Sequence, residues 1–469
     1  MMLVEPVSLR PVAQLGAVHF VAIGGSGMAP IALLYHESGV EVSGSDRSDS
    51  ATMRLLRDAG ITVYVGHDAA HLGSARTVVV SSAIGESNPE VQAARERDLR
   101  VWHRSAALGA LLLGRRGVAV TGTHGKTTTS AMTAMALAAA GESPGYVVGA
   151  VLADTGRASC LGSGTDFVVE ADESDGSFRQ YPVETFVVTN IEADHLDNWG
   201  TPEAYYAGYG EAVRGDEVRQ VVACIDDPGA ARLVAELRAE DRRVVTYGTD
   251  ASADLRIEAP RFEGSGARAG LVIEDEHHDL VLGVPGLHNL RNAAAAVAVG
   301  LLRSIPAADS LAALRGFHGT SRRFEFVGRW RGAAVYDDYA HHPTEVAAAL
   351  TAARTVAGAG RVIACFQPHL FTRTRTFAVE FAAALALADE IVVCPIYPAR
   401  EQPIPGVTSA LITDRLRADE RAGVHDVASL DEAADLLAGL ARPGDLVLTL
   451  GAGDVTTVGP LLRERREPT

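Results

Sequence analysis

Short apolar runs that end in glycine or in polar residues recur along the chain. Residues 17–23 form one such run, a glycine turn follows at 24–27, and residues 28–38 then have a helical pattern. An apolar run of this length before a glycine turn is typical of a buried strand that feeds a helix. The pattern repeats at residues 40–43 and 78–82 with helical segments between, which predicts a parallel sheet with right-handed crossovers.

A second strand–turn–helix unit starts at residue 117. Residues 117–121 are followed by another glycine turn and by a long helix that runs to Ala140, where Gly141 ends it. Residues 255–285 alternate polar and apolar positions, which indicates short antiparallel strands before an Ala-rich helix at 290–303. Between these segments, strands are expected at 167–171, 185–190, 220–225 and 243–247.

A third region opens at Arg322-Arg323-Phe324. Its apolar runs lie at 333–336, 361–366, 390–394 and 445–450, and helical segments alternate with them. A chain of 469 residues is too long for one ordinary core. We therefore expect three α/β domains with short linkers near 114–117 and 316–321. They are a Rossmann-like parallel-sheet domain (1–115), a central P-loop ATPase-like domain with a small antiparallel sheet (116–318), and a C-terminal Rossmann-like domain (319–469).

Composition narrows the function classes. The net charge is −17 and no basic tract could follow a nucleic-acid backbone, so nucleic acid is not an expected partner. The N-terminus has no apolar segment behind a basic start, and no apolar run approaches the ~20 residues of a membrane span. We expect a cytoplasmic protein without membrane insertion. The four cysteines are widely spaced without a CxxC pair, which favours buried free thiols over disulfides or a zinc site.

The glycine turn at the second unit carries Lys126, the only lysine in the chain. The segment reads Thr121-Gly122-Thr123-His124-Gly125-Lys126-Thr127-Thr128-Thr129 and comes directly before a helix. Backbone amides at such a helix start can hold the phosphates of ATP, a lysine can neutralise them, and a threonine can bind Mg²⁺. The general P-loop pattern has a further glycine where this chain has Val120, and the other interpretation is a glycine turn with a solvated lysine.

Carboxylates and a histidine follow two of the expected strands in the central region. Glu170 ends one strand, and Asp194 and His195 come after the next, so both strand ends could contribute to a Mg²⁺ site beside the nucleotide. Asp172 and Glu173 come just after Glu170, and a helix-capping pair is an equally good interpretation of these two residues.

Residues 17–46 taken alone suggest a different class of enzyme. The glycine turn and Asp46, which lies 19 residues after Gly27, fit the binding site of an NAD-dependent oxidoreductase. The first glycine of that fingerprint is missing, and this interpretation leaves Lys126, Glu170 and His195 unexplained. A binding module without catalysis is a third possibility.

The whole set of motifs resembles the Mur ligases over essentially the full chain. Besides the two glycine turns, the matching segments are Ser43–Asp46, Ser81–Ile84, Glu170–Asp175, Asn190–Asp197, Pro285–Asn289, Arg322–Phe324, Asp337–Glu345, Phe366–His369 and Gly451–Asp454. The resemblance implies a UDP-sugar domain, a central ATPase domain and a C-terminal domain that closes over ATP and the amino acid. It also implies ATP-dependent ligation of L-alanine to UDP-N-acetylmuramate through an acyl phosphate, by a monomer or a homodimer.

A recycling ligase of the same family, which adds a whole peptide to the same UDP-sugar, remains the nearest alternative. Residues 172–178 favour the L-alanine ligase, because the recycling enzymes generally carry a tyrosine after the Asp-Glu pair.

The resemblance also assigns site residues. It implies two Mg²⁺ sites, for which Mn²⁺ could substitute, with Thr127, Glu170 and His195 as ligands. Catalysis is expected of Lys126, His195, His341, His369 and Arg373. ATP would contact Gly122, Thr123, His124, Gly125, Lys126, Thr127, Thr128, His288, Asn289, Arg323 and Asp337. The UDP-sugar would contact Gly24, Gly25, Ser26, Gly27, Asp46, Ser81, Ser82 and Ala83. A neutral histidine could take the proton of the alanine amine, although the sequence does not single one out.

Four positions depart from the family pattern. Ala22 stands where a glycine is usual, and Ala29-Pro30 replaces a pair of small residues. A methyl group at Ala22 is tolerable if φ is negative there, and Pro30 is tolerable in the first turn of the helix. Ala340 in place of glycine is a similar mild change.

Overall fold

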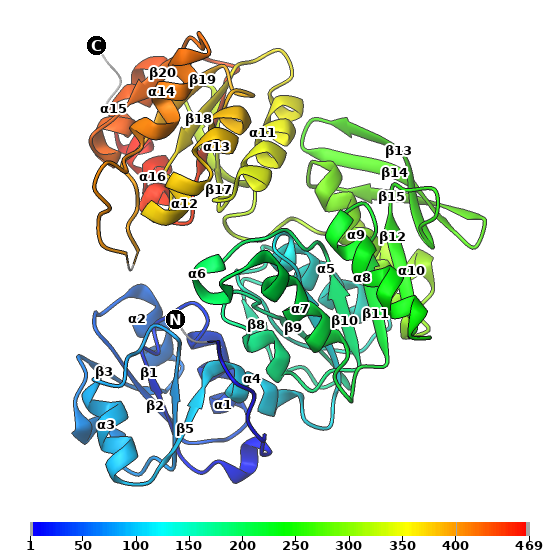
Figure 1. Ribbon diagram of the computed structural model, residues 1–469, viewed down its shortest axis with the longest axis vertical. Helices are drawn as coiled ribbons and strands as arrows, with labels where there is room; N and C mark the ends of the chain where they lie inside the picture. Colours follow the sequence, from blue (N-terminus) through cyan, green and yellow to red (C-terminus); the bar gives the residue numbers. More distant parts are fainter. Residues whose placement is uncertain (1–2, 400, 466–469) are drawn as a thin grey trace. The chain divides into compact units, whose positions relative to one another are not determined.

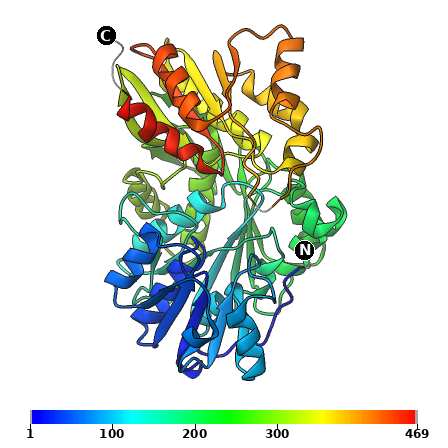
Figure 2. The same cartoon turned by 90° about the vertical axis from the view of Figure 1, so that its left-hand side faces the viewer.

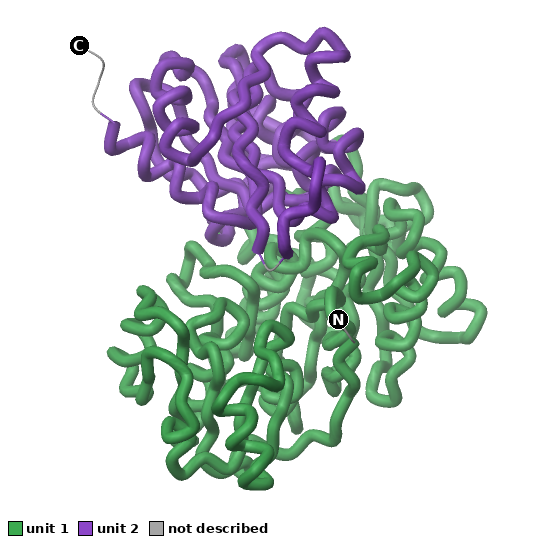
Figure 3. Tube along the Cα trace, turned by 60° about the vertical axis from the view of Figure 1, so that its left-hand side comes forward, with its two compact units in different colours: residues 1–259, 270–280, 291–316 green, residues 260–269, 281–290, 317–469 purple. Residues whose placement is uncertain are grey.

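The computed structural model describes residues 3–399 and 401–465. Its strands form three sheets of five, ten and six strands, each with its own helices (Figure 1). Contacts divide the chain into two compact units (Figure 3). The first unit comprises residues 1–259, 270–280 and 291–316, and the second comprises 260–269, 281–290 and 317–469.

The first sheet is parallel and has the order β3-β2-β1-β4-β5. Phe20 packs with α1, α2 and α4 on one face, whereas its neighbour Val21 packs with Leu72 and Ala94 on the other, so the strands are covered on both faces (Figure 2). The strands are β1 (Val18–Val21), β2 (Val42–Asp46), β3 (Thr62–Val65), β4 (Thr77–Val80) and β5 (Arg100–His103). The helices are η1 (Val12–Gln14), α1 (Ala29–Glu37), α2 (Ala51–Asp58), η2 (Ala69–Leu72), α3 (Pro89–Glu96) and α4 (Arg104–Leu112).

The second sheet has the order β15-β14-β13-β12-β11-β10-β6-β9-β7-β8. Its central strand β6 pairs in parallel with β10 and β9, so the carboxyl ends of these three strands lie at one edge. The strands are β6 (Arg116–Thr121), β7 (Gly145–Val147), β8 (Ser159–Cys160), β9 (Asp166–Glu170), β10 (Thr185–Val188), β11 (Gln220–Cys224), β12 (Val244–Gly248), β13 (Leu255–Glu263), β14 (Gly266–Ile273) and β15 (Glu276–Leu282). Because two-residue turns join β13 to β14 and β14 to β15, these neighbours run antiparallel, as the alternating pattern predicts.

The central region contains six α-helices and one 3-10 helix among the described residues. They are α5 (Lys126–Ala138), η3 (Ser177–Gln180), α6 (Leu196–Trp199), α7 (Pro202–Val213), α8 (Pro228–Ala239), α9 (Leu287–Leu302) and α10 (Ala307–Arg315). The first predicted linker, 114–117, overlaps the start of β6, whereas the second, 316–321, follows α10.

The third sheet has the order β16-β17-β21-β18-β19-β20, and only β16 runs antiparallel to its neighbour. Its strands are β16 (Glu325–Trp330), β17 (Ala333–Asp338), β18 (Val362–Phe366), β19 (Glu390–Val393), β20 (Val424–Asp426) and β21 (Leu446–Leu450). Its helices are α11 (Pro343–Ala357), α12 (Phe371–Thr376), α13 (Ala378–Leu385), α14 (Ala410–Ala418), α15 (Leu430–Leu440), η4 (Asp454–Thr457) and α16 (Val458–Glu464). Alternate residues of β18 enter two separate cores, which confirms a layered α/β domain.

Ala22 has a φ of +61°, so it adopts the left-handed conformation, and the condition under which a methyl group is tolerated without strain is not met. All four cysteines are free, but Cys160 is only half-buried, so the expectation of four buried thiols was wrong at this position. Pro30 does lie in the first turn of α1.

The predicted three-domain α/β class is correct, whereas the boundaries at 115/116 and 318/319 stay predictions. Within residues 3–399 and 401–465, none of the helices combines the length and apolar character that a membrane span requires.

Candidate functional site

Residues 122–125 between β6 and α5 form the predicted phosphate loop, whose backbone needs glycine at two positions. Gly122 has a φ of +139°, and a β-carbon there would overlap the Thr189 hydroxyl. Gly125 has a φ of +80° and forms the N-cap of α5. The Asn190 carboxamide clamps the loop, because it accepts a hydrogen bond from the His124 N–H (2.8 Å) and donates one to the His124 carbonyl (3.0 Å).

Lys126 is the first residue of α5, and its ammonium points back into this loop. Its Nζ donates hydrogen bonds to the carbonyls of Gly122 (2.6 Å) and Thr123 (3.1 Å) and lies 2.8 Å from Glu173 Oε2. Burial alone would lower the pKa of Lys126, but the charges of Glu173 and Asp172 outweigh it and raise this pKa. The loop therefore holds a permanent positive charge.

Glu173 is a residue for which the sequence left a site role and a helix-capping role equally open. Its side chain is 1% exposed, and burial raises its pKa to about 7 despite the opposing charge of Lys126. Asp172 accepts a hydrogen bond from the Ser174 N–H (3.0 Å) and pairs with Arg104 (2.8 Å). Burial acts to raise the pKa of Asp172, yet Arg104 and Lys126 hold it well below its usual range. No helix begins at this pair among the described residues, so the helix-capping interpretation was wrong.

The predicted metal ligands gather at the carboxyl ends of β9 and β10. The Thr127 hydroxyl donates a hydrogen bond to Glu170 Oε1 (3.0 Å), and Glu170 Oε2 accepts one from the Gly149 N–H (2.6 Å). His195 is the N-cap of α6 with a φ of +52°, and its Nε2 lies 3.9 Å from Glu173 Oε1. A hydroxyl and a carboxylate side by side are the hard oxygen ligands that Mg²⁺ prefers, so these residues fit the ion. The two-ion assignment stays a prediction.

The predicted UDP-sugar residues follow three adjacent strands, β2, β1 and β4. The Gly24 N–H donates a hydrogen bond to Asp46 Oδ2 (3.0 Å), which joins the glycine turn to the end of β2. After β4, the Ser82 hydroxyl donates to Asp175 Oδ2 (2.5 Å) and lies 3.0 Å from His103 Nε2. Burial and then Arg104 lower the pKa of His103 to about 4. Gly25, Ser26 and Gly27 complete the turn, and Ser81 and Ala83 flank Ser82, so the structure groups all eight residues at one sheet edge.

In the second compact unit, the structure brings His341, His369 and Arg373 together. The two imidazole rings lie 5.9 Å apart, and Arg373 Nη1 is 3.4 Å from His369 Nδ1. Arg373 is 6% exposed, so it is a buried arginine rather than a surface one. The His369 ring also stacks on Tyr397.

The other predicted ATP contacts in this unit have local partners. Arg323 lies over the Tyr339 ring (5.2 Å). The Asp337 carboxylate is buried and accepts hydrogen bonds from Thr449 (2.5 Å) and Thr456 (2.9 Å). At the start of α9, His288 follows Gly286, and the Asn289 amide donates to the Pro285 carbonyl (2.7 Å). Their roles at the nucleotide stay predictions.

Asn292, one turn further along α9, is a residue that sequence reasoning missed. Its Oδ1 would lie 3.1 Å from a β-carbon at Gly125, so it lines the phosphate loop. Its spacing from Asn289 on one helix face is the signal that could have identified it.

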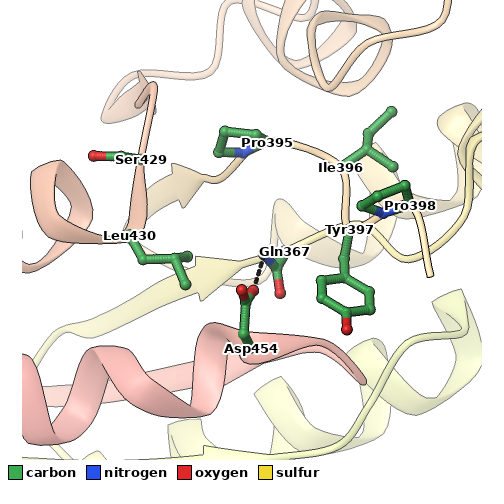
Figure 4. Close-up of a pocket in the computed structure, with 8 residues that line it drawn as sticks. All are labelled: Gln367, Pro395, Ile396, Tyr397, Pro398, Ser429, Leu430 and Asp454. Carbon is green, nitrogen blue, oxygen red and sulfur yellow. Dashed lines mark hydrogen bonds between the residues drawn. The ribbon is translucent and has the colours of Figure 1, made fainter. Parts of the chain in front are cut away.

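A pocket of about 240 Å³ opens at the carboxyl ends of β18, β19 and β21 (Figure 4). Gln367 lines this pocket. Its side-chain amide donates a hydrogen bond to Asp454 Oδ1 (2.7 Å) and accepts one from the Val455 N–H (3.0 Å). The lining residues are Gln367, Pro395, Ile396, Tyr397, Pro398, Ser429, Leu430 and Asp454. Since Tyr397 stacks on His369, the pocket borders the histidine–arginine cluster, and crevices at this end of a parallel sheet are common ligand sites.

Three family models and a relative of similar length match most of the chain. The family model "Mur ligase family, catalytic domain" matches residues 17–146, "Mur ligase middle domain" matches 120–300, and "Mur ligase, glutamate ligase domain" matches 322–453. A UDP-N-acetylmuramate–L-alanine ligase of Cutibacterium acnes is 56% identical over 467 residues, which cover 98% of each chain.

Solved structures agree with this similarity. A UDP-N-acetylmuramate–alanine ligase from Thermotoga maritima is 29% identical, with a TM-score of 0.82 over 96% of this chain and 98% of that one. A murein peptide ligase from Psychrobacter arcticus is 25% identical, with a TM-score of 0.70 and the same coverage. The chain belongs to the Mur ligase family.

Proposed function

We propose that this protein is an ATP-dependent ligase that joins L-alanine to UDP-N-acetylmuramate in peptidoglycan precursor synthesis. The observation that carries the proposal is the full-length similarity, at 56% identity, to a protein of that activity. The geometry supports the same class of chemistry, because Lys126 and the Thr127–Glu170 pair meet at one sheet edge. The substrate set implies action in the cytoplasm, where ATP is made available.

The reaction has two steps that balance. A carboxylate oxygen of the lactyl group attacks the γ-phosphorus of ATP, and the bond to ADP breaks, which gives an acyl phosphate. The amine of L-alanine, having lost a proton, then attacks the acyl carbon and displaces phosphate. The products are UDP-N-acetylmuramoyl-L-alanine, ADP, phosphate and one proton.

The central demand on the protein is to bring a carboxylate and a triphosphate together despite their like charges. The Lys126 ammonium, held at the loop by Glu173 and two carbonyls, supplies a fixed positive charge at the attacked phosphate. Thr127, Glu170 and His195 would hold Mg²⁺, which would offset the remaining negative charge. The amides of the Gly122–Lys126 loop orient the phosphates.

The second step needs a proton acceptor and a group that holds the acyl phosphate. His341 and His369 are the candidate acceptors, and the buried Arg373 is suited to bind an anion through its planar fork. The His341 Nδ1 lies 3.0 Å from the Tyr339 carbonyl and 3.3 Å from Glu345 Oε2, and these two contacts orient the imidazole ring.

The recycling ligase is the second candidate, because the murein peptide ligase of Psychrobacter arcticus shares the fold. Measuring ADP release with UDP-N-acetylmuramate while varying the acceptor separates the two. L-alanine should support turnover, with glycine and L-serine weaker and a tripeptide inactive. Release with the tripeptide but not with L-alanine would assign the recycling activity, and ADP release independent of any acceptor would refute ligation. Stabilisation by NADH but not by Mg-ATP in a thermal melt would restore the oxidoreductase interpretation.

A further inference from the structure

Arg104 is the first residue of α4, at the carboxyl end of β5, and none of the site predictions includes it. Its guanidinium reaches the glycine turn after β1, where Nη1 would lie 3.3 Å from a β-carbon at Gly27. The missing side chain at Gly27 therefore makes room for the arginine. The contact joins two strands that β4 separates in the sheet.

The guanidinium has more donors than its protein partners use. Among the residues that the structure describes, Arg104 donates a single hydrogen bond, from Nη2 to Asp172 Oδ2 (2.8 Å). An arginine carries five N–H groups in a rigid fork. Its side chain is 20% exposed, so the protein does not enclose it completely. Donors left open next to a glycine turn suit an incoming anion with several oxygens.

Asp172 fixes the direction of the fork. It is anchored by the Ser174 N–H, and its carboxylate holds one end of Arg104. Because this half-buried carboxylate pairs with Nη2, the other terminal nitrogen, Nη1, is the one that lies toward the turn at Gly27. The neighbouring His103 stays neutral at physiological pH, since its pKa is lowered to about 4, so it does not compete for the anion.

We infer that Arg104 binds the diphosphate of the nucleotide sugar, with Asp172 as its positioning residue, and that it gives the first domain its preference for a nucleoside diphosphate over a monophosphate. This inference rests on the proposed function, because a UDP-sugar must bind at the glycine turn. It adds a positive charge to a turn whose own residues, Gly24 to Gly27, carry none.

The test is calorimetric binding of UDP-N-acetylmuramate, UDP and UMP without ATP, to the full chain and to three variants. Arg104→Met removes the fork, and Arg104→Lys keeps a single charge. Arg100→Met is the matched control, because Arg100 lies at the opposite end of the same strand, over Trp102. Thermal melts establish that each variant is folded.

Arg104→Met should weaken UDP about 10–100-fold and UMP far less, so that the preference for UDP disappears, while Arg104→Lys recovers part of it. Arg100→Met should bind like the wild type. A folded Arg104→Met protein that keeps its UDP preference would overturn the inference, as would equal losses for UDP and UMP, which indicate a structural role. If the wild type itself binds no UDP-sugar, the proposed function fails rather than the role of Arg104 alone.

Discussion

Two strand–turn–helix units of the first compact unit look alike in sequence and differ in where their charge comes from. In the first, between β1 and α1, Asp46 accepts the hydrogen bond of the Gly24 N–H, and the guanidinium of Arg104 reaches the turn from the end of β5. In the second, between β6 and α5, the cation is Lys126 of the helix itself. The difference teaches that similar glycine turns can receive their positive charge from different parts of the fold.

The two turns are also held in different ways. The half-buried carboxamide of Asn190 holds the second turn through two hydrogen bonds with the backbone of His124. The first is tied to β2, whose Ser45 donates a hydrogen bond to the fully buried Glu90 (2.5 Å) just before Asp46. Substitutions in each turn and at the residues that hold it test this difference.

Replacing the lysine should have the largest effect. We expect Lys126→Arg to fold but to lose about 10³-fold in kcat, a barrier change of ~4 kcal/mol, because a planar fork cannot replace a compact ammonium in the loop. Steady-state ADP release measures the loss, and a thermal melt controls for folding. Turnover within a few-fold of the wild type would contradict the role assigned to Lys126.

Replacing one glycine of each turn by alanine should show that the two turns differ in how well they tolerate a β-carbon. Gly122→Ala should destabilise the protein by about 3 kcal/mol, because the φ of +139° and the Thr189 hydroxyl both exclude a β-carbon. A β-carbon at Gly27 meets only the end of the Arg104 side chain, at 3.3 Å, and Gly27→Ala should cost under about 1 kcal/mol. Urea unfolding of both variants checks this, and equal losses would show that the turns have equivalent constraints.

Glu90 accepts the hydrogen bond of Ser45 beside the first turn, and its contribution to the free energy of unfolding should depend on pH. Burial acts to raise the pKa of Glu90, but hydrogen bonds from His19 and Ser45, the charge of His19 and a hydrogen bond from His71 outweigh it and lower this pKa to about 2. His67 also faces the carboxylate, at 3.1 Å. Since the folded pKa lies below the unfolded value of 4.5, the stabilisation is complete above about pH 5 and is lost as pH falls toward 2.

Between pH 5 and 3 this loss amounts to about 2 kcal/mol, and Glu90→Gln should remove it. Chemical unfolding at several pH values measures the slope for both proteins. Glu86→Gln is the control, because Glu86 is exposed. If the free energy of unfolding has the same pH dependence in the wild type and in Glu90→Gln, the ionised Glu90 does not stabilise the folded protein.

Most of the fold follows from the sequence, because buried parallel strands are apolar runs and their ends carry the polar residues of the site. The strands before Gly24, Gly122 and Glu170 are where the pattern places them. Sheet order does not follow in the same way, since β10, β6 and β9 are neighbours although β9 precedes β10 in the chain.

The site itself was only partly predictable. Motifs identify Lys126, but its partner Glu173 lies 47 residues away and looks like an ordinary acidic residue after a strand. Arg104 belongs to no motif, and its role depends on the three-dimensional approach to Gly27. Ala22 shows a local failure, because an alanine in the left-handed conformation contradicts the usual residue preference.

The smallest expected effect comes from this alanine. Ala22→Gly should stabilise the protein by about 0.5–1 kcal/mol, because glycine adopts the φ of +61° without strain, partly offset by its greater freedom when unfolded. Thermal unfolding of the variant beside Ala150→Gly, a substitution at another loop alanine, checks the sign. A loss of stability would mean that the methyl group packs favourably in the turn.

The most direct test of the central claim follows an oxygen atom through the reaction. UDP-N-acetylmuramate labelled with ¹⁸O in its carboxylate is turned over with Mg-ATP and L-alanine, and the released phosphate is analysed by mass spectrometry. Attack of the carboxylate on the γ-phosphate predicts one labelled oxygen in each phosphate, with the other retained in the new amide. Phosphate without label would contradict the acyl-phosphate route and, with it, the task assigned to Lys126.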